Sequence, residues 1–138
     1  MPSSKPPSWV RALLTLFVIV DTGFVLYWCI TALHFLPPEW LYKDYTNPLL
    51  VAWNWSFLPL DLAISATGYL ALAMWKAGRP VWRKWAIVSL ALTSASGLQA
   101  VSFWAIRSDF DPFWWAPNLF LLVYPWVFLP RLVSAAEE

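Results

Sequence analysis

Four long apolar runs constrain the fold of this chain more than any other feature. They cover about residues 9–36, 48–75, 81–106 and 113–133 of 138. Roughly 20 consecutive apolar residues suffice to cross the hydrocarbon core of a bilayer as an α-helix. The chain is 60% hydrophobic and only 12% charged, whereas roughly a quarter of the residues in soluble domains are charged. We therefore predict an all-α integral membrane four-helix bundle, with residues 1–138 forming a single transmembrane domain.

Helix-start signals mark two of these runs. Asn47 and Asp111 are good N-cap residues, and each is followed by a proline, which suits the first position of a helix. A turn containing glycine and proline, residues 76–80, separates the second run from the third. The even-numbered spans are therefore expected to begin immediately after Asn47 and Asp111.

Basic residues are distributed unevenly between the two ends of the predicted bundle. The connections after the first and third runs carry only Lys43 and Arg107. The other seven lie near the chain termini and the middle turn: Lys5, Arg11, Lys76, Arg79, Arg83, Lys84 and Arg131. Because lysine and arginine accumulate in cytoplasmic segments, we predict that both the N and the C terminus are cytoplasmic.

The chain offers few ligands for metals or redox chemistry. Cys29 is the only cysteine and His34 the only histidine, which argues against an intrachain disulfide, a thiolate cluster or an imidazole zinc site. With a net charge of +1 and no basic stripe, the chain also lacks the electrostatic footprint of a nucleic-acid-binding protein. We therefore name no catalytic residue and expect no metal, no cofactor and no nucleic-acid partner.

Two aspartates fall near the middle of the first and second runs. A carboxylate at the bilayer centre costs about 2.5 to 3.5 kcal/mol on insertion scales, so such residues usually face the bundle interior and are functional. No lysine or arginine lies at a depth that matches Asp21 or Asp61. We expect one or both to be uncharged at neutral pH, and the two could share a proton. The alternative is that each is neutral and hydrogen-bonds another helix.

The second run carries polar residues along one stripe. Asn54, Asp61, Ser65 and Gly68 follow one another at intervals of 7, 4 and 3 residues, which places them on the same helix face. Pro59 lies between them and removes a backbone hydrogen bond, so a kink with an exposed carbonyl is expected beside Asp61.

Amide and indole side chains are expected at a common depth in the half of the bundle away from the termini. Asn54, Gln99 and Asn118 predict either a hydrogen-bonded layer or the polar wall of a cavity, and the tryptophans at that level predict an aromatic lining. An aromatic belt with dense packing is the alternative. The candidate ligand-binding residues are Asp21, Asp61, Asn54, Gln99, Asn118, Trp28 and Trp55.

These residues favour a protein that binds a hydrophobic or cationic amphiphile, or a lipid-like molecule, in a pocket floored by Asp21 and Asp61. Membrane lipids are the other expected partners. One alternative is a proton-coupled exporter of small molecules, and another is a structural or accessory subunit. An enzyme acting on a membrane-embedded substrate is less favoured, because the sequence names no nucleophile.

Four segments, residues 21–28, 35–45, 47–61 and 103–111, resemble the small bacterial YvaD-type membrane proteins, an uncharacterised family, over nearly the whole chain. The resemblance implies a multi-pass protein of the bacterial cell (inner) membrane and supplies no activity or site residues. The four-span architecture is also similar to the sterol-isomerase and sigma-2-receptor group. That likeness implies an acidic pocket for hydrophobic amines or sterols.

Overall fold

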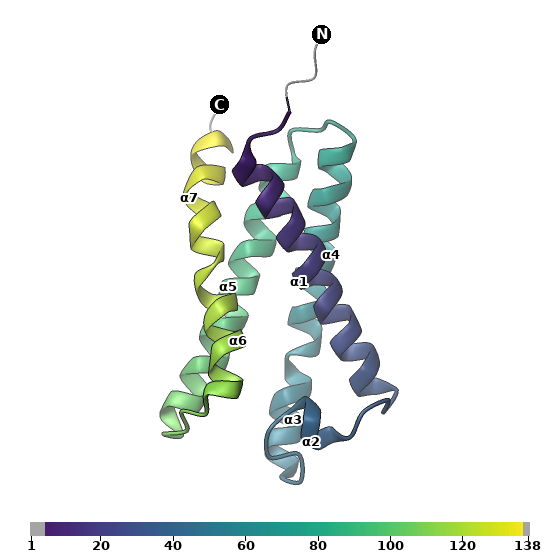
Figure 1. The fold of residues 1–138 in the computed structure, drawn as a ribbon, viewed down its shortest axis with the longest axis vertical. Helices are drawn as coiled ribbons and strands as arrows, with labels where there is room; N and C mark the ends of the chain where they lie inside the picture. Colours follow the sequence, from purple (N-terminus) through teal and green to yellow (C-terminus); the bar gives the residue numbers. More distant parts are fainter. Residues whose placement is uncertain (1–4, 137–138) are drawn as a thin grey trace.

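The computed structural model describes residues 5–136, and those residues form helices and turns without a strand (Figure 1). Four helical stretches are long and apolar enough to cross a membrane: Ser8–Ala32, Pro48–Lys76, Trp82–Ile106 and Pro112–Ala135. The predicted all-α protein with four spanning helices is thereby confirmed. Both ends of the chain lie at one end of the structure (Figure 1), and their cytoplasmic location stays a prediction. We call this the terminal end and the opposite one the loop end.

The first helix is shorter than the apolar run that encodes it. α1 (Ser8–Ala32) ends four residues before the expected end at 36. His34 adopts a left-handed conformation, with φ of 56°, and Phe35 N–H donates to the Ile30 carbonyl at 3.1 Å, which closes the helix end. Pro37 then prevents continuation, and the short α2 (Pro38–Leu41) follows within the connection. The apolar residues after Ala32 therefore belong to this connection.

The second span is interrupted as Pro59 predicts. α3 (Pro48–Ser56) and α4 (Leu58–Lys76) meet at Phe57, whose N–H donates at 3.2 Å to the Asn54 carbonyl, three residues back rather than four. The Ser56 hydroxyl donates to the Trp53 carbonyl at 2.6 Å. In a regular helix the Trp53 carbonyl would accept the hydrogen bond of Phe57 N–H. Here the Ser56 hydroxyl takes the place of that donor.

The predicted helix starts are confirmed. The Asn47 side chain accepts a hydrogen bond from Leu49 N–H, and the Asp111 side chain accepts one from Phe113 N–H, both at 3.0 Å. Asp111 caps α6 (Pro112–Val123), which Tyr124 separates from α7 (Pro125–Ala136). The fourth span is thus also divided into two helices ahead of a proline.

α5 (Trp82–Ile106) occupies the centre of the packing, because it contacts α4, α6 and α7, whereas α1 packs mainly on α4. Small residues allow the closest approach. A Cβ added at Gly97 would lie 2.5 Å from Leu122 N and 2.6 Å from Asn118 O. Ser94 donates to the Leu122 carbonyl at 2.9 Å across the same interface. The backbones of α5 and α6 are therefore in direct contact.

Large side chains close the bundle at the terminal end. Leu13 and Phe17 of α1, Leu90 of α5 and Leu132 of α7 are completely buried in one apolar cluster. Figure 1 shows α1 crossing the bundle obliquely, near α7 at the terminal end and away from α6 at the loop end. The apolar cluster therefore joins α1 to α5 and α7 at the terminal end.

Gly97→Ala tests the α5–α6 contact. The added methyl group is expected to force the backbones apart and to lower the free energy of unfolding by about 1 to 3 kcal/mol, the usual cost of overpacking. Gly23→Ala is the matched control, because nothing lies within 4 Å of a Cβ at Gly23. The control is expected to be neutral or slightly stabilising. Thermal unfolding in detergent measures both, and equal stabilities for the two variants would contradict the packing described here.

Candidate functional site

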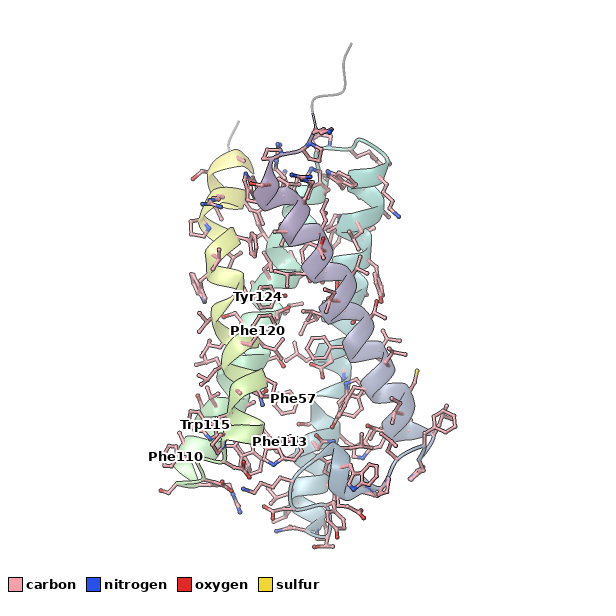
Figure 2. The ribbon with its side chains drawn as sticks, viewed as in Figure 1. Phe57, Phe110, Phe113, Trp115, Phe120 and Tyr124 are labelled. Carbon is pink, nitrogen blue, oxygen red and sulfur yellow. The ribbon has the colours of Figure 1, made fainter. Side chains whose placement is uncertain are left out.

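A cavity of about 350 Å³ lies in the loop end of the bundle. Its size is at the lower limit for sites that hold small molecules. The walls come from α1, α3, α4, α5 and α6, and residues 41–43 of the connection close part of one end. Figure 2 shows Phe57 directed into the space between α4 and α6. The aromatic side chains that line the cavity are Phe24, Tyr27, Trp28, Tyr42, Trp53, Phe57, Trp104 and Trp114.

Asp61 places a carboxyl group at the deep end of this cavity. Trp28 Nε1 of α1 donates to Asp61 Oδ2 at 2.9 Å, and Ser96 Oγ of α5 donates to Oδ1 at 3.4 Å. The residue is 5% exposed, and no ion pair reaches it among residues 5–136. Each carboxyl oxygen thus accepts a hydrogen bond from a neighbouring helix. Asp61 is therefore a buried acceptor that faces the cavity without a cation.

Asp21 lies deeper and does not line the cavity. It is 1% exposed, and neither carboxyl oxygen has a hydrogen-bond partner in the described part of the chain. The carboxyl group packs against Gly68, where an added Cβ would overlap it, while Ser65 Oγ donates to the Asp21 backbone carbonyl at 2.9 Å. Gly68 follows Asp61 by seven residues, or about 10 Å of helix. The two carboxyl groups thus lie at different levels and are not bonded to one another.

Three more of the sequence-based candidates surround the cavity. Trp28, Asn54 and Asn118 line it. The Tyr27 hydroxyl donates to Asn54 Oδ1 at 3.2 Å, while Asn54 Nδ2 is buried without a partner within residues 5–136. Asn118 Nδ2 donates to the carbonyl of Trp114 in its own helix at 2.7 Å. Asn54 therefore retains a free donor.

Trp55 and Gln99 lie outside the cavity wall. The Trp55 ring packs behind Trp28, with centroids 5.3 Å apart. Gln99 is exposed on α5, whose buried face at that level carries Ser96 and Ala100. Depth in the membrane fixes only the level of a residue, and the rotation of its helix decides which way it faces. The structure therefore does not bring the three amides into one layer.

An ion-pair clamp, which we define as Lys43, Asp44, Arg107, Asp109 and Asp111, joins the two connections at the loop end. Lys43 Nζ lies 2.6 Å from Asp109 Oδ2 and 3.6 Å from Asp111 Oδ2, and Arg107 lies 3.8 Å from Asp44. Lys43 lines the cavity. No local pattern in the sequence predicts this clamp, although both connections at this end carry charges of both signs.

Aromatic groups support the clamp. Lys43 Nζ lies 5.7 Å from the centroid of the Trp104 ring, a cation–π distance. Trp115 Nε1 donates to the Asp109 carbonyl at 2.6 Å, which fixes the backbone of the turn that carries this acid. Ser96 and Trp104 are eight residues apart on α5, so the cavity extends about 12 Å from the Asp61 carboxyl to the clamp.

The charges of the clamp stabilise one another. The hydrogen bond from Lys43 lowers the pKa of Asp109 below its ordinary value, and the same bond raises the pKa of Lys43. Because Lys43 faces two acids here, its positive charge is already compensated. No group of three or more His, Cys, Asp or Glu in the described part of the chain is placed to hold a metal ion.

The clamp should withstand mild acid. A carboxyl group whose pKa is lowered by folding stabilises the folded state above its unfolded value, about 3.9, and this contribution is lost only as the pH falls through the lower, folded value. We expect the hydrogen-exchange protection of residues 107–111 to persist at pH 4 and to fall below it. Asp109→Asn should show low protection at every pH. Equal protection in both proteins at pH 7 would show that the clamp does not hold the turn.

The comparisons with known proteins identify the family of this chain. A family model described as "Family of unknown function (DUF5360)" matches residues 13–138. The chain is 44% identical over 129 residues to "Uncharacterized protein YvaD" of Bacillus subtilis (strain 168), covering 94% of this chain and 97% of that protein. No solved structure matches. The resemblance predicted from the sequence is thus confirmed, and this multi-pass membrane protein belongs to the DUF5360 family.

Proposed function

We propose that this protein binds an amphipathic amine in the loop-end cavity, with the ammonium group on Asp61 and the apolar body against the aromatic walls. The observation that carries the proposal is the Asp61 carboxyl, which faces a cavity lined mainly by aromatic and aliphatic side chains and forms no ion pair with any residue between 5 and 136. An ammonium group would gain a charge-assisted hydrogen bond from Asp61 and a cation–π contact from Trp28.

The dimensions of the cavity narrow the class of ligand. About 350 Å³ and a length of roughly 12 Å from Ser96 to Trp104 suit one amine with a single chain or ring system. A diacyl phospholipid is too large to enter completely. One end of the Asn54 amide has no partner within residues 5–136 and supplies one further hydrogen-bonding group along the wall, which would suit a hydroxyl group on the ligand.

Entry from the bilayer fits the arrangement of the walls. The ion-pair clamp spans the loop end. Between α1 and α6, by contrast, the lining residues Phe24 and Tyr27 are partly exposed and Pro117 is exposed. A molecule dissolved in the membrane can therefore reach the cavity from the side. We further propose the bacterial cell membrane as the location, because the relative is bacterial and the distribution of basic residues favours cytoplasmic termini.

Octylamine and octanol, which differ only in the polar group, test the role of Asp61. Wild-type protein in nanodiscs at pH 7 is expected to bind octylamine at least tenfold more tightly than octanol, because a hydrogen bond to a charged group contributes about 1.5 to 3 kcal/mol. Asp61→Asn retains an acceptor for Trp28 but loses the charge, so it should remove this preference. Tryptophan fluorescence titration measures the affinities.

Gln99→Ala, on the exposed face of α5, is the control and should bind octylamine as the wild type does. An unchanged preference for octylamine in Asp61→Asn would contradict the proposal. That outcome would leave the alternative structural role, in which the Asp61 hydrogen bonds only hold α1, α4 and α5 together.

Asp21 favours a second candidate, a proton-coupled exporter. Its carboxyl group is buried at the centre of a span without any partner among residues 5–136, which is an expensive arrangement for an acid with no function. It lies one helical turn below Phe24, a cavity residue, so the release of a proton from Asp21 could be coupled to the occupancy of the cavity.

Transport measurements separate the two candidates. An exporter should accumulate tetraethylammonium, which crosses bilayers poorly, in proteoliposomes under an imposed pH gradient. Asp21→Asn should abolish this accumulation while leaving the affinity for octylamine unchanged, because Asp21 does not touch the cavity. A wild type that binds octylamine but shows no gradient-driven accumulation would contradict the exporter and leave the binding protein.

A further inference from the structure

A second hollow lies at the terminal end, far from the cavity of the proposed function. It has a volume of about 290 Å³ and is formed by the turn between α4 and α5. It is lined by two arginines, Arg79 and Arg83, by two tryptophans, Trp75 and Trp82, and by Gly78 and Pro80 of the turn. Gly78 has a φ of 66°, which allows the sharp reversal between the two helices.

Arg83 carries an unused donor in this hollow. Its Nε is buried and has no hydrogen-bond partner within residues 5–136. The guanidinium carbon lies 5.7 Å from the centroid of the Trp82 ring, so the group is held against an aromatic face. The protein covers Nε, but the side chain as a whole is only partly buried and lines the hollow, so an anion would meet its terminal nitrogens. A guanidinium fork matches the oxygens of a phosphate or carboxylate. The side chain is therefore positioned to receive an anion.

No described acid supplies that anion. Asp21 and Asp61 lie within the spans, and the other four acids within residues 5–136 lie in the connections at the loop end: Glu39, Asp44, Asp109 and Asp111. Neither Arg79 nor Arg83 takes part in an ion pair in the described part of the chain. Lys76 and Lys84 flank the hollow and add to its positive charge.

The place of the hollow indicates the source of the anion. Trp75 is the penultimate residue of one span and Trp82 is the first residue of the next, where indole rings lie at the level of the lipid headgroups. Basic pockets between membrane helices on the cytoplasmic side bind anionic headgroups, and the distribution of basic residues predicts that this end is cytoplasmic. Trp75, Pro80 and Trp82 give the hollow an apolar side that suits the glycerol and upper acyl region of a lipid.

We propose that the turn between α4 and α5 is a binding site for the phosphate group of an anionic phospholipid, held by Arg83 and Arg79. This site does not depend on the proposed amine binding, because it shares no residue with the loop-end cavity.

The test compares phosphatidylglycerol with phosphatidylcholine of the same acyl chains. Native mass spectrometry of the purified full chain in detergent measures how much of each lipid stays bound. We expect the wild type to prefer phosphatidylglycerol. The double variant Arg79→Gln/Arg83→Gln should lose about fivefold in affinity for each arginine. Arg83→Lys, which keeps the charge but loses the fork, should be intermediate.

The control is Arg11→Gln/Arg131→Gln, which removes the same charge from exposed positions at the same end of the bundle. It should keep the preference within twofold. Equal losses in both double variants, or none in Arg79→Gln/Arg83→Gln, would overturn the proposal. If that variant does not fold, Arg83→Lys decides alone, since unchanged binding by it would contradict recognition through the guanidinium fork.

Two further arms distinguish other anions. If inorganic phosphate displaces phosphatidylglycerol at equal concentration, the site is one for a free anion and the lipid proposal is overturned. Glu137 and Glu138 lie outside the described residues, so a chain ending at Ala136 tests whether they are the anion. Unchanged binding of phosphatidylglycerol supports the proposal, whereas a preference that appears only after truncation would assign the site to the chain's own C terminus.

Discussion

The hydrogen bonds of Asp61 connect three of the four spans through one side chain. Its carboxyl group accepts one hydrogen bond from Trp28 of α1 and another from Ser96 of α5, so a single side chain of α4 joins three helices. At this level the character of the bundle changes. Toward the terminal end, buried apolar side chains of α1, α4, α5 and α7 pack in one cluster. Toward the loop end, aromatic rings surround a cavity instead. Asp61 lies between the two regions, where it accepts hydrogen bonds from neighbouring helices and forms the end of the cavity farthest from the loop end.

The two buried aspartates illustrate how far environment separates identical groups. Asp61 has two donors and an open space before it, while Asp21 has neither. Only Asp61 therefore presents a hydrogen-bonded carboxyl group to an open space. The sequence places both at similar depth and so suggests one shared site. The structure separates them by about two turns of helix, because α1 and α4 run antiparallel and each aspartate meets a different part of its neighbour.

The features of this fold that depend on local rules could be predicted from the sequence. Apolar length predicted four spans, N-cap chemistry placed the starts after Asn47 and Asp111, and Pro59 predicted the break near Phe57. Features that depend on how one helix packs against another could not be predicted in this way. The outward direction of Gln99 depends on how α5 turns its small residues toward α6. The pairing of Lys43 with Asp109 joins residues 66 positions apart, which no local pattern reveals.

The contact between Asp21 and Gly68 has a consequence for the history of this chain. An acid at position 21 is compatible with the close approach of α1 and α4 only while position 68 lacks a side chain, since a methyl group there would occupy the space of the carboxyl group. The side chains tolerated at the two positions therefore depend on one another. A lineage that replaces the glycine must first or simultaneously shorten the residue at 21, and relatives that keep the acid should keep the glycine even where the surrounding helix surfaces have diverged.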